Sequence, residues 1–443
     1  MNGKKRILVV DDDPAIVEFI VMTLQSGPYE LESACDGVEA LEKASAFLPD
    51  LVILDLMMPR MHGFEVCQRL RSDGKHEGVK ILVTSAKAYS VDVDNAKEAG
   101  ADAYLTKPYA AKGLLEKVEG LLGAPAASAA SKTGSAESPA PVPAPLPPVV
   151  PARSGDPFVV RFWGVRGSSP APGPHTVRYG GNTACVELRL GDLLLVIDCG
   201  TGLRELGNAL LAEFRDRAIL GHVFVGHTHW DHIQGFPFFT PFYVPRNEFF
   251  VYSIRAAGKS LERVFRGQMA ADYFPVPLDN LSSQLRFVEM EGPVDLGALK
   301  VSYHHLNHPG ITIGFRFQTQ SGKTVCYLSD HEPFGRLNAP SEATRRQEQG
   351  IVDFVRDSDL LICEAQYTEE EYRSRKGWGH STFDEVVARA IASGSRRLAL
   401  FHHDPGHTDE MMDGFVEHCR ALIAKAGSPL ECFAAREGQT LSL

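Results

Sequence analysis

The sequence lacks the features of an exported or membrane-bound chain. No stretch approaches the roughly 20 apolar residues that a membrane helix needs. The apolar run near the N-terminus is four residues long before it meets three aspartates, so it is not a signal peptide. The eight cysteines include no CxxC pair, and we interpret them as buried free thiols. We therefore expect a cytoplasmic protein with no membrane partner.

A basic surplus is also missing. The formal net charge is −11, with roughly −6 before residue 124 and roughly −6 after residue 155. This balance argues against a broad surface that follows a phosphate backbone, although it permits one bound nucleotide. We expect no extensive nucleic-acid surface.

A long segment without apolar periodicity divides the chain. Residues 124–157 are dominated by Ala, Pro and Ser, which is typical of a flexible to extended linker. A chain of 443 residues also exceeds what one hydrophobic core usually supports. The sequence therefore predicts one domain over 1–123 and a second over 158–443.

The first domain alternates apolar runs with amphipathic stretches. Strands are predicted over 6–10, 50–56, 79–85 and 102–107, and helices over 14–24, 63–72, 91–100 and 112–122. This alternation predicts a parallel sheet with helices on both faces and a site at the carboxyl ends of its strands.

Charged and hydroxyl side chains follow these predicted strands. Asp11 and Asp12 come after "LVV" and Asp55 after "VIL", while Ser85 and Lys107 end two later strands. Clustered carboxylates favour a hard divalent cation such as Mg²⁺. A metal-bound carboxylate beside a lysine can accept a phosphoryl group. Taken alone, "DDD" is explained equally well as a solvated turn before a helix.

Together with "LDLMMPRMHG" and "TKPY", these residues make 5–122 resemble a two-component response-regulator receiver domain. The resemblance implies a doubly wound, five-stranded parallel sheet and Mg²⁺-dependent phosphorylation by a sensor histidine kinase. The positions it assigns are the acidic pair Asp11 and Asp12, the phosphoacceptor Asp55, a backbone carbonyl ligand at Met57, the switch residues Ser85 and Tyr104, and Lys107. Dimerisation through the later helices of the receiver is a further expectation.

The second domain has closely spaced strands. They are predicted at "FVVRFWGV", "ACVELRL", "DLLLVIDCG", "HVFVGHTH", "LKVSYHHL", "ITIGFRFQTQ" and "KTVCYLSD", with a Ser321-Gly322 turn between the last two. Helices are predicted at "TGLRELGNALLAEF" and "TFDEVVARAIASG". We expect mixed sheets with outer helices.

Histidine is crowded into the stretch "GHTHWDHIQG". The chain has no HExxH motif, and this stretch is predicted to be a loop at a strand end. His227 and His229 could serve one metal ion, and Asp231 and His232 a second. Further ligands must come from other strand ends, and spacing alone does not choose among the candidates: His304, His305, His308, Asp330, His331, Glu332, His402, His403, Asp404 and His407.

Residues 158–443 resemble a metallo-β-lactamase-fold hydrolase, on the evidence of "HTHWDH", "VIDCGTG", and "GFR" six residues after His308. The last feature is similar to the branch of tRNA 3′-processing endonucleases and cyclic phosphodiesterases. The resemblance implies an αββα sandwich with two metal sites. It assigns His227, His229, His308 and Asp330 to one ion, Asp231, His232, Asp330 and His402 to the other, and Asp198 to the support of the metal loop.

The resemblance also implies a proton donor. His380, before a predicted helix, would protonate the leaving oxygen, with Glu364 holding its proton and Asp231 counted as catalytic besides binding metal. The alternative for His380 is a surface histidine, with Ser381 or Thr382 capping the helix. Zn²⁺ fits the histidine-rich ligand sets, and Mn²⁺ or Fe²⁺ fits almost as well.

The substrate is less specified. Arg166, Gly167, Arg178 and Asn182 are weak candidates for phosphate contacts, and most aromatic residues after the histidine motif are expected to pack in the core. We predict a response regulator whose output is a dinuclear-metal phosphodiesterase acting on a small or cyclic nucleotide. The alternatives are a thioester or lactone hydrolase on the same fold, and a non-enzymatic scaffold stabilised by metal.

Overall fold

The chain divides into two units, each described by itself below. The computed structural model describes residues 4–25, 27–58, 60–76, 78–85, 90–107, 109, 111–123, 156–254, 260–338 and 341–443. The predicted linker over 124–157 lies outside the described residues except for its last two, so the predicted domain limits stay predictions. No helix among the described residues combines the length and the apolar character that crossing a bilayer requires.

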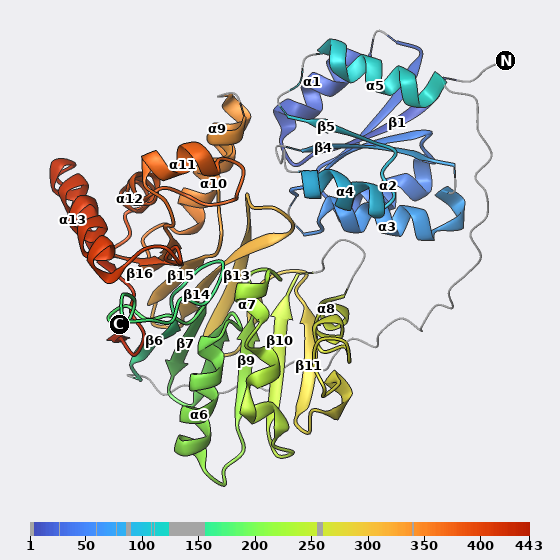
Figure 1. Ribbon diagram of the computed structural model, residues 1–443. Coiled ribbons are helices and arrows are strands. Elements are labelled where there is room, and N and C mark those ends of the chain that lie inside the picture. The colour runs from blue at the N-terminus through green and yellow to red at the C-terminus, as the bar shows by residue number, and fades with distance from the viewer. Residues whose placement is uncertain are drawn as a thin grey trace. The chain divides into compact units, whose positions relative to one another are not determined.

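The first unit is a five-stranded parallel sheet between two layers of helices (Figure 1). Its strands are β1 (Lys5–Val10), β2 (Tyr29–Ala34), β3 (Leu51–Asp55), β4 (Lys80–Ser85) and β5 (Ala103–Thr106), in the order β2-β1-β3-β4-β5. Its helices are α1 (Pro14–Leu24), α2 (Gly37–Phe47), α3 (Gly63–Ser72), α4 (Ser90–Glu98) and α5 (Ala111–Gly123), with a short 3₁₀ turn at Gly74–His76. This architecture confirms the predicted fold of the N-terminal segment.

The sequence did not reveal β2 and α2. Strand β2 is an edge strand with the sequence YELESA, and only Ala34 in it is buried. A strand covered so incompletely does not need the continuous apolar run that marked β1 and β3.

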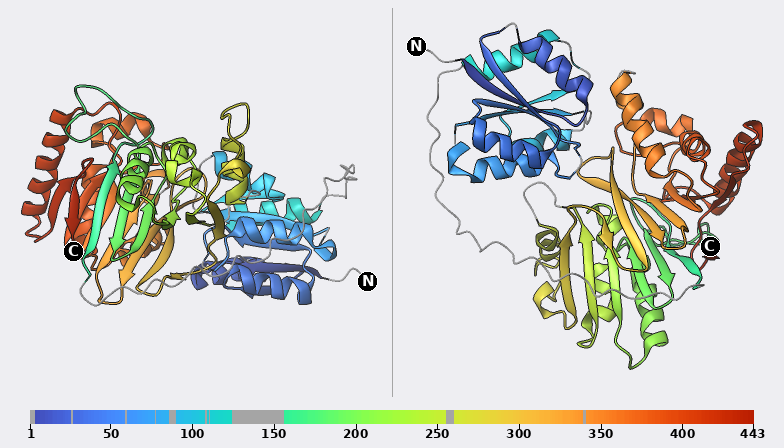
Figure 2. Two further views of the ribbon diagram at one scale, coloured as in Figure 1. Left: turned by 90° about the horizontal axis from the view of Figure 1, so that it is seen from below. Right: turned by 180° about the vertical axis from the view of Figure 1, so that it is seen from behind.

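The second unit contains two seven-stranded sheets that pack face to face (Figure 2). The first sheet is formed by β6 (Phe158–Gly164), β7 (Cys185–Leu190), β8 (Leu193–Ile197), β9 (Leu220–Phe224), β10 (Glu248–Ser253), β11 (Gln284–Glu289) and β19 (Thr440–Ser442). The second is formed by β12 (Val294–Asp295), β13 (Leu299–Leu306), β14 (Thr312–Thr319), β15 (Thr324–Leu328), β16 (Leu360–Glu364), β17 (Arg397–Phe401) and β18 (Glu431–Ala434). The main core lies between the two sheets.

Helices cover the outer faces of both sheets, which completes the predicted αββα sandwich. They are α6 (Gly202–Phe214), α7 (Trp230–Ile233), α8 (Leu261–Gln268), α9 (Phe334–Leu337), α10 (Glu342–Phe354), α11 (Glu369–Arg375), α12 (Phe383–Ala392) and α13 (Asp409–Lys425), with 3₁₀ turns at Phe236–Phe238, Thr240–Tyr243 and Leu278–Asn280. A second apolar cluster lies beneath α6 and α8 and includes Phe236, Phe239 and Phe242 from the aromatic stretch after the histidine motif. These three rings are therefore core residues.

One local prediction was wrong. The histidine motif was expected to be a loop throughout, but Asp231 and His232 lie in the short helix α7. His229 is its N-cap residue, and the His232 amide donates to the His229 carbonyl at 3.0 Å. This turn presents Asp231 and His232 to a second group of converging side chains, so one motif contributes to two neighbouring groups.

Candidate metal centre

The carboxyl ends of several strands meet at one edge of the sandwich. His227 and His229 follow β9, His308 follows β13, Asp330 follows β15 and His402 follows β17. Strands β15, β16 and β17 run parallel, so their carboxyl ends lie at the same edge of the second sheet. The topology therefore gathers side chains that are up to 175 residues apart in the chain.

Two groups of potential ligands converge there. Within each group the ligand atoms lie within 4.8 Å of one another, and Asp330 belongs to both groups. The groups are His227, His229, His308 and Asp330, and Asp231, His232, Asp330 and His402. These are the two sets that the resemblance assigned, although their role as metal ligands stays a prediction.

Hydrogen bonds orient the imidazoles toward the centre of the cluster. Nδ1 of His308 lies 2.8 Å from the carbonyl oxygen of Gly379, and Nδ1 of His232 lies 2.8 Å from Oδ2 of Asp198. Nδ1 of His402 lies 3.2 Å from Oε1 of Gln366. Because each of these partners accepts, Nδ1 carries the proton and Nε2 presents a lone pair.

These lone pairs test whether the site fits metal ions. Nε2 of His232 and Nε2 of His402 lie 3.1 Å apart, and Nε2 of His402 lies 3.0 Å from Oδ2 of Asp231. Nε2 of His227 is buried without a hydrogen-bond partner among the described residues. Such an arrangement is unfavourable unless cations lie between the groups. The residues present therefore fit a pair of divalent ions.

The ionisation of His227, His308 and Asp330 agrees with this reading, whereas that of His232 does not. Burial opposes protonation of His232, but Asp231 and Asp330 outweigh it and raise its pKa well above the usual value, so a metal ion at this position would displace a proton. Burial lowers the pKa of both His227 and His308 well below the usual range, so both imidazoles are neutral at neutral pH. Burial opposes ionisation of Asp330, but His402 and His232 outweigh it and hold the pKa of that carboxyl well below its usual value. Neutral imidazole and ionised carboxylate are the forms that bind metal.

Asp198 supports the cluster from outside. It follows β8, and its Oδ1 accepts the Gly226 amide at 2.8 Å. Its Oδ2 accepts from His232, and from the Tyr327 hydroxyl at 2.5 Å. Asp198 is not among the converging ligands, so its contacts are those of a residue that holds the metal loop.

His380 lies within the cluster and is 6% exposed, which excludes the alternative of a surface histidine. Its ring centroid is 5.2 Å from that of His308 and 5.3 Å from that of His402. Its Nδ1 lies 3.7 Å from Oε2 of Glu364. Burial raises the pKa of Glu364 well above its usual value and lowers the pKa of His380 to about 4. The neighbouring Thr382 caps α12, as the sequence suggested.

Several other candidates are bound elsewhere. His304 stacks on Phe354, His331 lies 3.1 Å from the Asn307 amide, His403 lies 2.9 Å from the Ala435 carbonyl and His407 lies 2.9 Å from Glu371. None of these four is in the two converging groups.

The predicted phosphate contact at Arg166 was wrong. Its side chain is fully buried and donates to the carbonyls of Gly180, Asp404 and His407. Asn182 is also engaged, because its side chain donates to Glu437 at 3.0 Å. These bonds join the loop after β6 to the loops after β17 and β18, which is a structural role.

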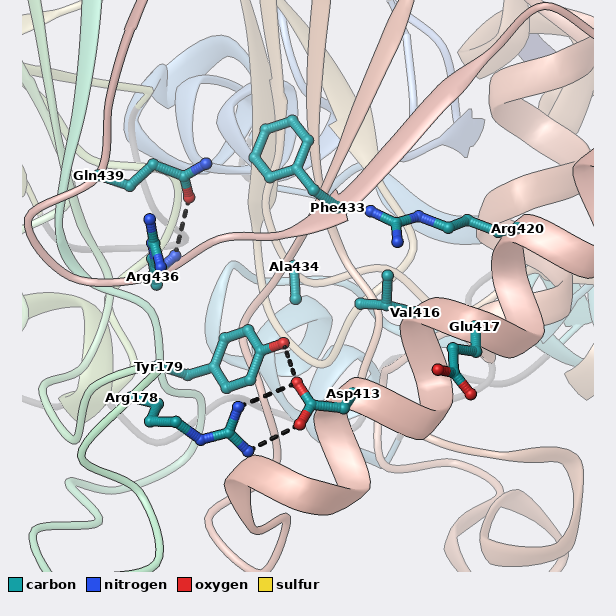
Figure 3. Close-up of a pocket in the computed structure, with 10 residues that line it drawn as sticks. All are labelled: Arg178, Tyr179, Asp413, Val416, Glu417, Arg420, Phe433, Ala434, Arg436 and Gln439. Atoms are coloured by element: carbon teal, nitrogen blue, oxygen red, sulfur yellow. Dashed lines mark hydrogen bonds and ion pairs between the residues drawn. The ribbon is translucent and has the colours of Figure 1, made fainter.

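Gly167 and Arg178 belong to the same loop but serve different surroundings. A Cβ at Gly167 would lie 2.2 Å from Nδ1 of His402, so only glycine lets the loop come this close to that ligand. Arg178 instead forms a bidentate ion pair with Asp413, with N–O distances of 2.7 and 3.2 Å, at the wall of a cavity of about 630 Å³ beside α13 (Figure 3). The residues that line this cavity include none of the candidate metal ligands.

Two residues that sequence reasoning missed hold the second ligand group. The Ser168 amide donates to Oδ2 of Asp231 at 2.6 Å, and Gln366 contacts both His402 and the Ser168 hydroxyl. Neither has a sequence signal of its own. The position of Gln366, two residues after the end of β16, is the one clue that was available.

The receiver site is smaller and lies at the carboxyl ends of β1, β3 and β5. Nζ of Lys107 lies 2.6 Å from Oδ2 of Asp11 and 2.5 Å from Oδ1 of Asp55. Burial and the nearby Asp55 raise the pKa of Asp11 to about 7, and burial raises the pKa of Asp12 to about 6. The hydroxyl of Tyr104 hydrogen-bonds the Ser85 side chain, so the two predicted switch residues are in contact. At Met57 the amide donates to Asp55 at 2.6 Å, and the role of its carbonyl stays a prediction.

The first unit thus places a lysine between two buried carboxylates, and the second gathers histidines and aspartates in two groups that could hold metal ions. Comparison with known families agrees. Residues 7–119 match the response regulator receiver domain, and residues 194–403 match the beta-lactamase superfamily domain. The two units are thus similar to a response regulator receiver domain and to a beta-lactamase superfamily domain, respectively.

Curated relatives of this chain include response regulators that match about a quarter of its length. The DNA-binding dual master transcriptional regulator RpaA of Synechocystis is 40% identical over 26% of this chain and 48% of its own length. The response regulator MprA of Mycobacterium ulcerans is 46% identical over 26% of this chain and 50% of its own length. This chain thus spans about half the length of the curated relatives it matches.

Solved structures resemble the second unit. The metallo-beta-lactamase fold protein YhfI from Bacillus subtilis is 20% identical, covers 65% of this chain and 100% of its own, and superposes with a TM-score of 0.47. The short form of human tRNase Z is 19% identical, covers 64% of this chain and 98% of its own, and has a TM-score of 0.43.

Proposed function

We propose that the second unit is a dinuclear metal-dependent phosphodiesterase acting on small or cyclic nucleotides, under control of phosphorylation at Asp55. The observation that carries this proposal is the position of His380. It lies beside both ligand groups, together with Glu364, and its Nδ1 makes no hydrogen bond with any described residue.

The metals would be held by the two groups that share Asp330, and Zn²⁺ suits these histidine-rich sets best. When bound, such ions activate water and neutralise the charge of a phosphoryl group. The chain's own residues keep the ligands in the right form. Asp198 and Gln366 fix the tautomers of His232 and His402, and Ser168 fixes Asp231.

His380 would supply the proton that a departing alkoxide needs. Oε1 of Glu364 accepts the Ser381 amide at 2.7 Å, which aims Oε2 at Nδ1 of His380. A proton given to Nδ1 leaves the opposite ring nitrogen, Nε2, as the donor to the leaving oxygen. A thioester or lactone has less need of such a donor, so the pair favours phosphodiesters.

In the receiver, we propose that Asp11, Asp12 and the Met57 carbonyl hold Mg²⁺ and that Asp55 accepts phosphate from a sensor histidine kinase. Lys107 already bridges Asp11 and Asp55 and would neutralise the transferred group. Ser85 and Tyr104 would then respond together, because they are in contact. Dimerisation of the receiver would provide one route by which this change reaches the hydrolase.

The test is a substrate panel with metal analysis. We would assay bis-nitrophenyl phosphate and cyclic nucleotides beside thioesters and lactones on the wild type, His380→Ala and Asp55→Ala. His380→Ala should lower phosphodiester turnover by about 10²- to 10⁴-fold while the metal content stays the same. Asp55→Ala should abolish the response to a phosphodonor.

Two outcomes would reject the proposal. Turnover of thioesters or lactones without phosphodiester turnover would assign the acyl-hydrolase alternative. Metal-replete protein that turns over none of these substrates would assign the scaffold alternative.

Glu364→Gln is the matched variant for His380→Ala, because it retains the shape and the acceptor for Ser381 but alters the proton supply.

A further inference from the structure

Two of the three tryptophans are exposed and are next in the chain to His229 and Gly379, which belong to or contact the first ligand group. Trp230 and Trp378 are each 61% exposed. Trp163 behaves differently, because its Nε1 donates to Glu187 at 2.7 Å and the Arg161 guanidinium lies 4.2 Å from its ring centroid. Large rings left in solvent near a site are a feature of ligand-binding surfaces.

Both tryptophans are adjacent to the side of the cluster that is open to solvent. Trp230 follows His229, which is the exposed member of its ligand group, whereas its three partners are buried. Trp378 precedes Gly379, whose carbonyl is 2.8 Å from Nδ1 of His308. Nε2 of His308 is in turn 3.0 Å from Nδ1 of His229. One histidine therefore connects the two segments that carry the tryptophans.

The segment that carries Trp378 is held firmly. The buried carboxylate of Glu332 accepts the amides of Gly377 at 2.9 Å and Gly379 at 2.8 Å, as well as the Tyr372 hydroxyl. Gly377 and Gly379 have φ values of +87° and +94°, which favour glycine. Because the backbone on both sides of Trp378 is fixed, its exposure is not the result of a loosely packed loop.

We propose that Trp378, together with Trp230, binds the planar base of a nucleotide substrate by stacking. The proposal rests on the phosphodiesterase function and adds the substrate class: a phosphodiester with a nucleobase close to the scissile bond. Stacking uses the face that every base presents, so these residues would select nucleotides over alkyl phosphodiesters without selecting one base. Glu332 would act as a positioning residue for this surface and for His380, three residues after Gly377.

The test compares two substrates with the same leaving group. Thymidine 5′-p-nitrophenyl phosphate carries a base, and methyl p-nitrophenyl phosphate does not. We expect the wild type to prefer the thymidine ester. Trp378→Ala should shrink the ratio of the two kcat/KM values by about tenfold, mainly through KM, because loss of one stacked base costs this much. Trp378→Phe retains a ring and should keep most of the preference, and Trp163→Phe should keep all of it.

A binding measurement separates this proposal from the proposed function. Titration calorimetry would compare thymidine 5′-monophosphate with methyl phosphate on the metal-loaded protein. Trp378→Ala should weaken binding of the nucleotide about tenfold more than binding of methyl phosphate. If the wild type hydrolyses neither ester, the proposed function fails and this titration alone decides the stacking surface. Equal losses for both ligands in Trp378→Ala, at unchanged metal content, would overturn the stacking proposal, as would a Trp378→Phe variant as weak as Trp378→Ala. Trp230→Phe and Trp230→Leu provide the same comparison at the second ring.

Discussion

The receiver site and the metal centre both lie at the carboxyl ends of parallel strands, where distant parts of the chain meet. In the receiver, Asp11 and Asp55 are bridged by Lys107, so carboxylate charge is balanced by an ammonium group. In the second unit, the ion-pair contacts of Asp231 and Asp330 among the described residues are with histidines rather than with lysine or arginine. Under the proposed function, the same topological position would hold oxygen ligands for a hard ion in one unit and imidazoles for a transition metal in the other.

The difference also extends to what surrounds each site. Lys107 is a charged group that can be drawn toward an incoming phosphate. The imidazoles of His308 and His402 are instead held by neutral partners, the Gly379 carbonyl and the Gln366 side chain. We therefore expect the side chains of the receiver site to move when a ligand binds and those of the metal centre to keep their positions.

The largest expected effect is at Asp330, which is shared by both ligand groups. Asp330→Asn should lower the metal content and reduce phosphodiester turnover by at least about 100-fold. Loss of a residue that only supports a ligand typically costs about 10- to 100-fold, and Asp330 is itself a proposed ligand. Mass spectrometry of bound metal and the nitrophenyl assay would measure both. Phosphorylation of Asp55 from acetyl phosphate, followed by mobility shift, should be as fast as in the wild type.

Chelators test the same contrast without mutation. Phenanthroline, which prefers transition metals, should abolish hydrolysis and leave Mg²⁺-dependent phosphorylation intact. An Asp330→Asn protein that retained two metals per chain, or hydrolysis that survived phenanthroline, would contradict the proposed difference between the two sites.

A smaller effect concerns stability in acid. The second unit contains a buried histidine with a lowered pKa, and the receiver contains a buried aspartate with a raised pKa, so their effects on stability are opposite. Burial lowers the pKa of His222 to about 4, so the folded second unit keeps it neutral while the unfolded chain protonates it below about 6.5. Its contribution to stability is present above pH 6.5 and is lost as the pH falls toward 4, by about 3 kcal/mol. Asp11 has a raised pKa of about 7, so the metal-free receiver gains stability as the pH falls below 7.

Thermal unfolding between pH 7.5 and 4.5 would follow the two transitions. His222→Leu should flatten the acid loss of the second unit, and Asp11→Asn should flatten the acid gain of the receiver. His222 hydrogen-bonds Tyr252 at 3.0 Å, so the variant will also change the stability at neutral pH. The slope against pH is therefore the quantity to compare, and an unchanged slope in His222→Leu would contradict the expectation.

Local patterns allowed much of this molecule to be predicted. Apolar runs marked the buried strands, and the histidine motif indicated a metal site. The choice of His308, Asp330 and His402 among the candidates at later strand ends came from the family resemblance. What was missed depends on contacts between distant segments. Arg166 was a candidate because arginine often contacts phosphate. Only the fold shows that its side chain donates hydrogen bonds to three backbone carbonyls instead. Glu332 looked like a ligand candidate, but it binds the Gly377–Gly379 segment 45 residues later.

The smallest effect is expected at Gln366. Its neutral side chain holds His402 in place by a hydrogen bond, whereas the charged Lys107 holds Asp11 and Asp55 in the receiver site. Oε1 of Gln366 accepts from Nδ1 of His402, and its Nε2 donates to the Ser168 hydroxyl at 3.1 Å. Gln366→Leu should weaken metal binding by about tenfold, because His402 loses the partner that holds its Nε2 toward the cluster. Gln366→Glu keeps an acceptor for His402 and should bind metal more tightly than Gln366→Leu, as measured by competition with a chromogenic chelator. If both variants bound metal like the wild type, the backbone after β17 would be sufficient to orient His402, and the rigidity attributed to this site would not come from its surrounding hydrogen bonds.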